Sequence, residues 1–332
     1  MTLELSPIAF GAMAHAGARA PGERVELIER AVEEGITTLD TAPLYGFGES
    51  ERLVGRAIAS RRDRVQVLSK VGLAWDAEAR GELLFATPDR RVVCDSRPER
   101  VQREVLASLE RLGIERLDLV QVHHPDRLTP IGETFGALKD LVGQGRARAV
   151  GASNFSPVQL EEARRALAPT PLFSTQERYS LVYRDVERTL VPYCAANGVG
   201  LLAYSPLAQG ILAGRTLFGG AMPKHDFRTA DPSFLPGNLA AIHRAIRRSL
   251  DPIAEARGVS IGAVALAWLK ARPSVRTVIA GASSPTQLAE LARALRLELT
   301  DHERAEIEVA FARPMTRRGL IARLPGAGLF TR

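Results

Sequence analysis

Four side chains that can hold or donate a proton stand at or just beyond the ends of short apolar runs. They are Asp40, Tyr45, Lys70 and His123. A phenol beside an ammonium and a carboxylate can donate a proton, because the ammonium favours the phenolate and brings the tyrosine pKa from about 10 toward neutral. In such a group Asp40 keeps Lys70 charged and in place, and His123 orients or polarises a carbonyl oxygen. These residue types therefore predict acid catalysis on a carbonyl group, provided that the fold brings them together.

The stretch 39–50, LDTAPLYGFGES, carries two of these residues on one predicted loop. It follows a β-branched run, so Asp40 closes a strand and the chain then turns toward a helix. Proline fixes one φ and Gly46 and Gly48 permit tight turns, so the loop can hold the Asp40 carboxylate near the Tyr45 phenol. Taken alone, the same residues also fit an ordinary turn with a capping Asp and a half-buried Tyr.

Periodicity along the chain predicts alternating strands and helices. Eight strands are expected at residues 7–13, 36–40, 65–70, 117–124, 147–154, 172–176, 200–206 and 275–281. Helices are expected at residues 23–34, 49–60, 98–112, 130–142, 157–167, 186–196, 238–256, 260–271, 285–296 and 301–311. Eight such units predict an α/β fold, a (β/α)8 TIM barrel, as a single domain over residues 1–332 with extra C-terminal helices and an irregular tail from about 313 to 332.

In this fold the active site lies at the carboxyl ends of the strands. Seven of the eight predicted strands have a hydrogen-bonding side chain at or near that end, namely Asp40, Lys70, His123, Asn154, Gln176, Ser205 and Ser283. Alternation along the strand 117–124 turns Leu119, Gln121 and His123 into the barrel and the intervening valines outward. His124 should then point away from His123, which argues against a two-histidine metal site, and no metal is expected.

Composition excludes several other classes of protein. The net charge of +6 and pI of about 9.7 would suit nucleic acid, but the arginines alternate with glutamates on predicted helices and lack interleaved aromatic residues. No apolar run reaches the roughly 18 residues of a membrane span, and the two cysteines have no metal or disulfide spacing. A cytoplasmic protein without nucleic-acid or membrane partners is expected. Lys70 is one of only four lysines among 44 basic residues, and lysine changes its pKa on burial where arginine does not.

Two predicted loops are long. Residues 71–97 hold Trp75 and a possible hairpin around residues 87–90. Residues 208–237 combine glycine hinges with cations, and a segment of this length in a compact barrel is typical of a lid or of a disordered excursion. We expect it to fold over a bound pyrophosphate, with Arg215 making the charge-assisted contact.

Five motifs together resemble the aldo-keto reductase superfamily, in order and spacing from about residue 3 to 312. They are DTAPLYG at 40–46, LSK at 68–70, VQVH at 120–123, GASNF at 151–155 and AYSPL at 203–207. Within that superfamily the chain is most similar to bacterial general-stress and broad-specificity members. The resemblance implies that Asp40, Tyr45, Lys70 and His123 are a catalytic tetrad that reduces aldehydes and ketones, or oxidises the corresponding alcohols and sugars.

The resemblance also implies that NADP(H) lies extended across the barrel mouth without a Rossmann fold, and the stretch GFGESE at 46–51 indeed fails the G-x-G-x-x-G pattern. Ser153, Asn154 and Gln176 would hold the nicotinamide amide, with Tyr204 stacked on its ring. The implied pyrophosphate contacts are Ser205, Leu207, Gly210 and Arg215, and the implied adenosine contacts are Gly281, Ser283 and Gln287. Candidate substrate contacts are Phe47, Trp75 and His124, with His15 and Arg178 as further candidates.

Several positions depart from the family pattern. Gly281 and Gln287 replace the Lys and Arg with which many relatives grip the 2′-phosphate of NADPH, so NAD(H) is possible as well. Leu291 stands where an Asn usually contacts adenine. His124 replaces the common Trp after the catalytic His and should make that side of the site more polar.

Two other classes of function stay open on the sequence. One is a cofactor-binding regulatory or redox-sensing subunit with little turnover, although no feature of the chain points to a partner surface. The other is a Schiff-base aldolase on a similar barrel, with Lys70 as the nucleophile.

Overall fold

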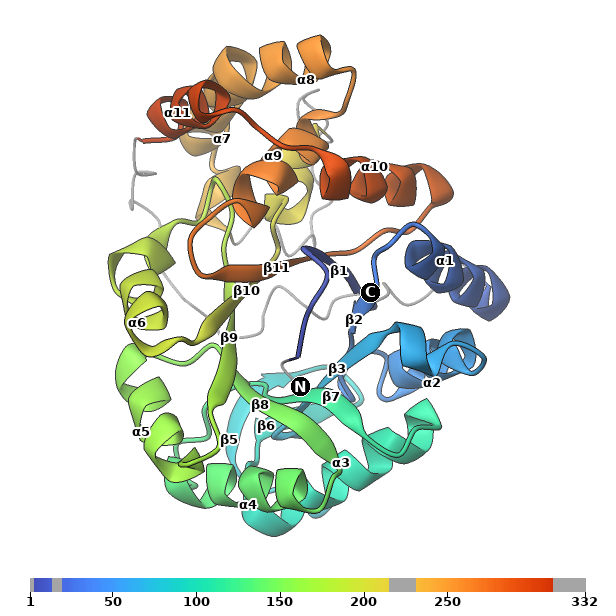
Figure 1. Ribbon diagram of the computed structural model, residues 1–332. Coiled ribbons are helices and arrows are strands. Elements are labelled where there is room, and N and C mark those ends of the chain that lie inside the picture. The colour runs from blue at the N-terminus through green and yellow to red at the C-terminus, as the bar shows by residue number, and fades with distance from the viewer. Residues whose placement is uncertain (1–2, 14–19, 215–230, 313–332) are drawn as a thin grey trace.

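In the computed structural model, which describes residues 3–13, 20–214 and 231–312, eight parallel strands close into a barrel (Figure 1). The order around the barrel is β1-β11-β10-β9-β8-β7-β3-β2, and β1 closes it by pairing with both β11 and β2. The barrel strands are β1 (Ile8–Gly11), β2 (Thr38–Asp40), β3 (Gln66–Val71), β7 (Leu117–Val122), β8 (Ala147–Ser153), β9 (Leu172–Arg178), β10 (Gly200–Tyr204) and β11 (Val275–Ala280).

Helices cover the outside of the barrel. Those that link consecutive barrel strands or follow the last one are α1 (Pro21–Glu33), α2 (Glu49–Ile58), α3 (Pro98–Leu112), α4 (Ile131–Gly143), α5 (Pro157–Leu167), α6 (Leu190–Asn197), α9 (Ile261–Lys270) and α10 (Pro285–Arg296). Additional helices are α7 (Pro236–Ala245), the π-helical turn η6 (Ile246–Leu250), α8 (Asp251–Arg257) and α11 (Asp301–Ala310). The predicted (β/α)8 barrel with extra C-terminal helices is confirmed.

Local sequence signals place several helix ends. Helix α5 begins at a capping box, in which Ser156 Oγ accepts from Gln159 N and the Gln159 side chain accepts from Ser156 N. Helices α3 and α8 end at Gly113 and Gly258, both in the left-handed conformation that glycine adopts without strain. The sequence therefore marks these helix ends locally.

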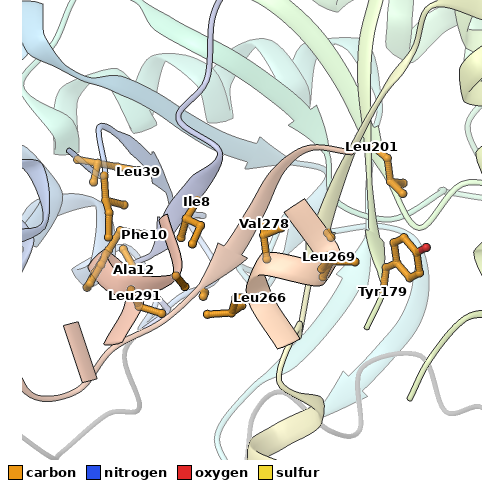
Figure 2. Close-up of a cluster of buried hydrophobic side chains, with 14 of the residues drawn as sticks. Ile8, Phe10, Ala12, Leu39, Tyr179, Leu201, Leu266, Leu269, Val278 and Leu291 are labelled. Atoms are coloured by element: carbon orange, nitrogen blue, oxygen red, sulfur yellow. The ribbon is translucent and has the colours of Figure 1, made fainter. Parts of the chain in front are cut away.

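Alternation along the strands separates two apolar layers. Leu68, Leu119 and Leu202 belong to a small cluster in the barrel interior. Val67 and Val120, one residue away, belong to the large cluster between the barrel and its helices. Figure 2 shows part of this outer layer, where side chains of β1 and β11 face those of α9 and α10. The inward orientation predicted for Leu119 is thus confirmed.

The segment after β3 forms a small antiparallel sheet of β4 (Leu73–Ala74), β5 (Glu82–Ala86) and β6 (Arg91–Cys94). Thr87 N donates to Arg90 O at 2.8 Å and closes the turn between β5 and β6. The hairpin expected around residues 87–90 is therefore confirmed.

Two element predictions need correction. The helix expected over residues 186–196 begins only at Leu190, because Thr189 has φ −135° and a separate turn, η2 (Asp185–Arg188), precedes it. The segment 208–237 is not irregular throughout, since it contains η3 (Ala208–Ala213), η5 (Pro232–Phe234) and the start of α7. Residues 215–230, with Arg215, lie outside the described residues, so the lid hypothesis rests on sequence alone.

Helices α2 and α3 approach each other closely at Gly55. A Cβ atom added there would lie 2.6 Å from the carbonyl oxygen and 2.9 Å from the carbonyl carbon of Leu112, which are backbone atoms that cannot rotate away. We expect Gly55→Ala to lower the free energy of unfolding by about 1 to 3 kcal/mol, measured by urea denaturation. The control is Gly136→Ala in α4, where a Cβ would meet nothing within 4 Å. Equal effects of the two substitutions would contradict the close approach.

Across the described residues, no single helix is long and apolar enough to cross a membrane. The segments Pro236–Arg257 and Ile261–Lys270 meet the combined requirements of length and hydropathy only as a pair, which is bent by 100°.

Candidate active site

Lys70 lies at the centre of a buried polar cluster at the carboxyl ends of β2 and β3. Its Nζ is 2.9 Å from Asp40 Oδ1 and 2.8 Å from Asp40 Oδ2. The same ammonium donates to Thr41 O at 3.0 Å and lies 3.2 Å from Tyr45 Oη. Lys70 is fully buried and Asp40 is 2% exposed, so these contacts are made out of reach of bulk solvent. The convergence of Asp40, Tyr45 and Lys70 predicted from the sequence is present in the structure.

The loop after β2 holds the Tyr45 phenol in this position. Gly46, Phe47 and Gly48 all have positive φ, so the chain reverses within three residues. Ser50 Oγ donates to Ala12 O at 2.8 Å, which leaves it to accept from the Thr41 hydroxyl at 2.7 Å. The loop is thereby tied at its base to the segment after β1, and its turn presents Tyr45 to Lys70.

His123 completes the group from β7, which ends one residue earlier. Its backbone N donates to Val71 O at 2.9 Å, so the residue stays beside β3. The His123 ring meets the Tyr45 ring edge to face, with centroids 5.9 Å apart and planes at 84°. The imidazole and the phenol therefore border one space at the barrel mouth, by which we mean the carboxyl ends of the strands.

Burial decides the protonation states. It raises the pKa of Tyr45 by more than the neighbouring ammonium of Lys70 lowers it. The prediction of a tyrosine pKa brought down toward neutral is therefore wrong, and the group is a neutral phenol. Burial lowers the pKa of Lys70, but Asp40 and Tyr45 together outweigh it and the net pKa is raised, so Lys70 stays charged as expected from the sequence. Burial, and next the charge of Lys70, hold the pKa of His123 well below its ordinary value, so the imidazole is neutral.

His123 and His124 do not diverge, contrary to the expectation from strand alternation. Their rings stack with centroids 5.5 Å apart and planes at 17°. The physical reason is that β7 ends at Val122, so alternation no longer governs these two residues. Among the described residues no group of three or more His, Cys, Asp or Glu could hold a metal ion.

Burial of His124 makes the stability of the fold depend on pH. Its pKa falls from 6.5 to about 4, so the unfolded chain binds more protons between these values. The stability that neutral His124 contributes is complete above the unfolded pKa and is lost as the pH falls toward the folded pKa. We expect the stability advantage of the wild type over His124→Gln to shrink by up to about 2 kcal/mol between pH 7 and pH 5, measured by urea unfolding. A difference that is independent of pH would contradict this.

The residues assigned by resemblance to the nicotinamide amide lie directly beside this cluster. Gln176 Nε2 donates to Asp40 Oδ1 at 2.8 Å, which leaves its amide oxygen to accept. Ser153 Oγ donates to Gln176 O at 2.9 Å, and Asn154 Nδ2 donates to His123 O at 3.0 Å. Tyr204 Oη donates to Asn154 Oδ1 at 2.9 Å. The strand ends of β7, β8, β9 and β10 thus form one hydrogen-bonded surface that is continuous with Lys70.

Farther along, the residues assigned to the rest of the cofactor divide into two places. Ser205, Leu207 and Gly210 lie in the turn from β10 into η3, and Ser205 and Gly210 have positive φ. Ser283 and Gln287 lie at the N-terminus of α10, where Gln287 Oε1 accepts from Ser283 N at 2.7 Å. Gly281 is exposed just after β11. Leu291, by contrast, is 3% exposed and packs in the outer apolar layer (Figure 2).

One wall of the mouth is aromatic and combines the loop after β2 with the segment that follows β3. Phe47 and Trp75 pack edge to face with centroids 5.2 Å apart. Both rings lie against a cluster that contains Tyr45, as do three residues that sequence reasoning missed, namely Met13, Leu84 and Phe85. The alternation of strand residues carries no such signal, because Met13 follows β1 whereas Leu84 and Phe85 lie on β5, and only the tertiary fold brings them to one cluster. His15 lies outside the described residues.

Two residues that follow Gln176 have different surroundings. The Arg178 guanidinium, a sequence candidate for substrate contact, pairs with Asp231 and stacks 3.4 Å from the centroid of the Tyr183 ring. Glu177, which sequence reasoning missed, accepts from Thr175 Oγ1 at 2.7 Å and from Phe155 N at 3.2 Å. Burial raises the pKa of Glu177 to about 7. Its backbone contact helps to hold the loop that carries Asn154.

The model of the aldo/keto reductase family matches residues 7–311 of this chain. The chain belongs to the aldo/keto reductase family. Two curated members are each 34% identical to it. The first is aldo-keto reductase YhdN of Bacillus subtilis, aligned over 92% of this chain and 89% of its own length. The second is the NADH-specific methylglyoxal reductase of Escherichia coli, aligned over 83% and 84%.

Solved structures of the family have the same fold. The glycerol dehydrogenase AKR11B4 from Gluconobacter oxydans superposes with a TM-score of 0.82 at 35% identity, over 93% of this chain and 92% of that one. The family assignment inferred from the five sequence motifs is thus confirmed, and relatives of this chain carry out carbonyl and alcohol oxidoreduction.

Proposed function

We propose that this protein reduces aldehydes and ketones with a nicotinamide cofactor, with Tyr45 as the general acid. The observation that carries the proposal is the buried contact of Lys70 with both Asp40 and the Tyr45 hydroxyl. The bound cofactor would supply the hydride. Residues of this chain would position the carbonyl and supply the proton.

Tyr45 is suited to give the proton because its pKa is raised and the phenol stays protonated at neutral pH. As its proton leaves, the ammonium of Lys70 at 3.2 Å stabilises the phenolate that develops. Asp40 keeps Lys70 charged and fixes its direction by accepting from Nζ with both oxygens. Neutral His123 can donate one N–H to the carbonyl oxygen without competing as an acid. The four residues thereby divide proton donation, charge stabilisation and substrate orientation among themselves.

The residues around the tetrad fit a nicotinamide dinucleotide by their chemistry. Asn154, Gln176 and Ser153 offer amide and hydroxyl groups of the kind that pair with a carboxamide. The ring of Tyr204 offers an aromatic face, and the N-terminus of α10 beside Ser283 favours a phosphate. Ser205, Leu207 and Gly210 would line the pyrophosphate. We therefore assign the nicotinamide to the β8–β10 strand ends and the adenosine to the side of α10.

The environment of Lys70 argues against a Schiff-base aldolase. A Schiff base needs a neutral amine, whereas the carboxylate of Asp40 holds Lys70 as an ammonium with a raised pKa. Borohydride added with a carbonyl substrate should therefore trap no covalent adduct, and a mass increase on Lys70 would favour the aldolase instead.

The reaction is tested by following NADPH consumption against a panel of aldehydes, ketones and sugars. We expect turnover of several carbonyl compounds, since the aromatic wall of Phe47 and Trp75 fits apolar groups of many shapes. Binding of NADPH without turnover of any panel member would instead favour a regulatory role.

We predict tighter binding of NADPH than of NADH, with a small margin. A charge-assisted contact to phosphate is worth about 1.5 to 3 kcal/mol. Because Gly281 and Gln287 cannot make such a contact, each should lower the preference for NADPH over NADH roughly tenfold relative to a Lys or Arg at the same position. Fluorescence titration with both nucleotides measures the ratio of Kd values. Gln287→Arg should raise the preference for NADPH by about tenfold. Tighter binding of NADH by the wild type, the specificity for which one relative is named, would overturn the prediction.

A further inference from the structure

The aromatic wall of the mouth carries a cation at its outer end. Arg90, in the turn between β5 and β6, places its guanidinium carbon 3.9 Å from the centroid of the Phe47 ring. Phe47 packs on Trp75, and both belong with Tyr45 to the apolar cluster beneath the hairpin. The guanidinium is therefore attached to the same wall that leads to the Tyr45 phenol.

Arg90 has no acidic partner within ion-pair distance in the part of the chain that the structure describes. Other arginines of this region do have one, since Arg97, Arg100 and Arg127 pair with Asp95, Glu104 and Glu82 respectively. Across the mouth, Arg178 is paired with Asp231. Stacking on an aromatic face restrains a guanidinium without using its N–H groups, so those of Arg90 stay available to a ligand.

The other groups of the site leave this charge uncompensated. Lys70 and Asp40 neutralise each other at 2.8 Å. Tyr45 is a neutral phenol, and the pKa values of both His123 and His124 are lowered, so these rings are neutral as well. A substrate that packs on Phe47 and Trp75 therefore meets the positive charge of Arg90 beside a tetrad without net charge.

We propose that Arg90 is a specificity residue that binds an anionic group, a carboxylate or a phosphate, on the carbonyl substrate. The proposal rests on the reductase function proposed above and names its substrate class. The carbonyl lies at Tyr45 and His123, the middle of the substrate packs on Phe47 and Trp75, and the anion reaches the exposed guanidinium of Arg90. Planar carboxylates and phosphates match the paired N–H groups of a guanidinium, which favours them over neutral polar groups.

The test compares anionic and neutral aldehydes of equal length. We would measure kcat/KM for the ω-oxo acids of four and six carbons against the alkanals of the same length, and for glyceraldehyde 3-phosphate against glyceraldehyde. The wild type should favour the anionic member of at least one pair, and Arg90→Gln should lower that ratio by about fivefold. The oxo-acid and phosphate arms show which anion is preferred.

Arg91→Gln is the matched control. Arg91 is exposed and follows Arg90 directly, so the substitution removes the same formal charge. Among the described residues it is Arg90, and not Arg91, that stacks on the Phe47 ring. The anionic-to-neutral ratio should stay at the wild-type value in Arg91→Gln. Equal loss of the ratio in both variants would reduce the effect to net charge and overturn the specific role of Arg90.

Two further measurements test the same contact without relying on the folding of Arg90→Gln. The wild-type preference for the anion should fall as salt rises from 0.05 to 0.5 M, because the contact is solvent-exposed and screened. Arg90→Lys should retain part of the preference, since it keeps the charge without the planar fork. If the protein reduces alkanals but shows no preference for the anionic aldehydes at any salt concentration, the role of Arg90 is contradicted and the reductase function stands. If the protein reduces no aldehyde at all, the proposed function is contradicted as well.

Discussion

Tyr45→Phe should abolish carbonyl reduction while leaving cofactor binding nearly intact. The substitution removes one oxygen, the proton donor that lies 3.2 Å from Lys70 Nζ, and leaves the ring in its apolar cluster. General acid catalysis contributes about 10²- to 10⁴-fold to a rate, so we expect kcat to fall by that factor. Steady-state kinetics with a good aldehyde measures the loss, and fluorescence titration should give a Kd for NADPH within about twofold of the wild type.

Tyr183→Phe is the control for the loss of a buried phenol. Its hydroxyl bonds to Asp231 and Ser233 instead of Lys70, so kcat should stay close to the wild-type value. If Tyr45→Phe turned over at the wild-type rate, the assignment of Tyr45 as the general acid would be wrong.

The second large effect is expected at Lys70. Lys70→Arg keeps the positive charge, but the site holds a compact ammonium within 3.2 Å of Asp40, Thr41 O and Tyr45 Oη and has no room for a planar fork. We expect kcat to fall by at least about 10²-fold, because the phenolate of Tyr45 then loses the point charge that stabilises it.

Lys70→Met tests the structural part of the same contact. It leaves the carboxylate of Asp40 buried without its cation, which should lower the free energy of unfolding by about 3 to 5 kcal/mol. The control for Lys70→Arg is Lys139→Arg, which should leave kcat unchanged, because Lys139 is partly exposed on α4 and bonds to Ala168 O away from the site. Wild-type turnover in Lys70→Arg would show that the position is structural.

The amino-acid sequence by itself determined the barrel and the positions of most polar groups around its mouth. Alternation along each strand is a local property with period two, so the inward direction of Leu119 and Lys70 could be predicted without knowing the fold. Asp40 and Lys70 could likewise be placed at strand ends, because prolines, glycines and β-branched runs mark those ends in the chain. Parallel strands then bring such ends to one edge, which is why the predicted tetrad converges.

Tertiary structure alone decided the electrostatics and the aromatic wall of the mouth. The direction of the Tyr45 pKa depends on how much water the surrounding residues exclude, and this burial outweighs the charge of Lys70. The stacking of His123 on His124 depends on the residue at which β7 stops pairing with its neighbours. The stacking of Arg90 on Phe47 depends on how the β5–β6 hairpin folds against the loop after β2. Each of these properties arises from groups far apart in the chain, whose separation after folding no local pattern encodes.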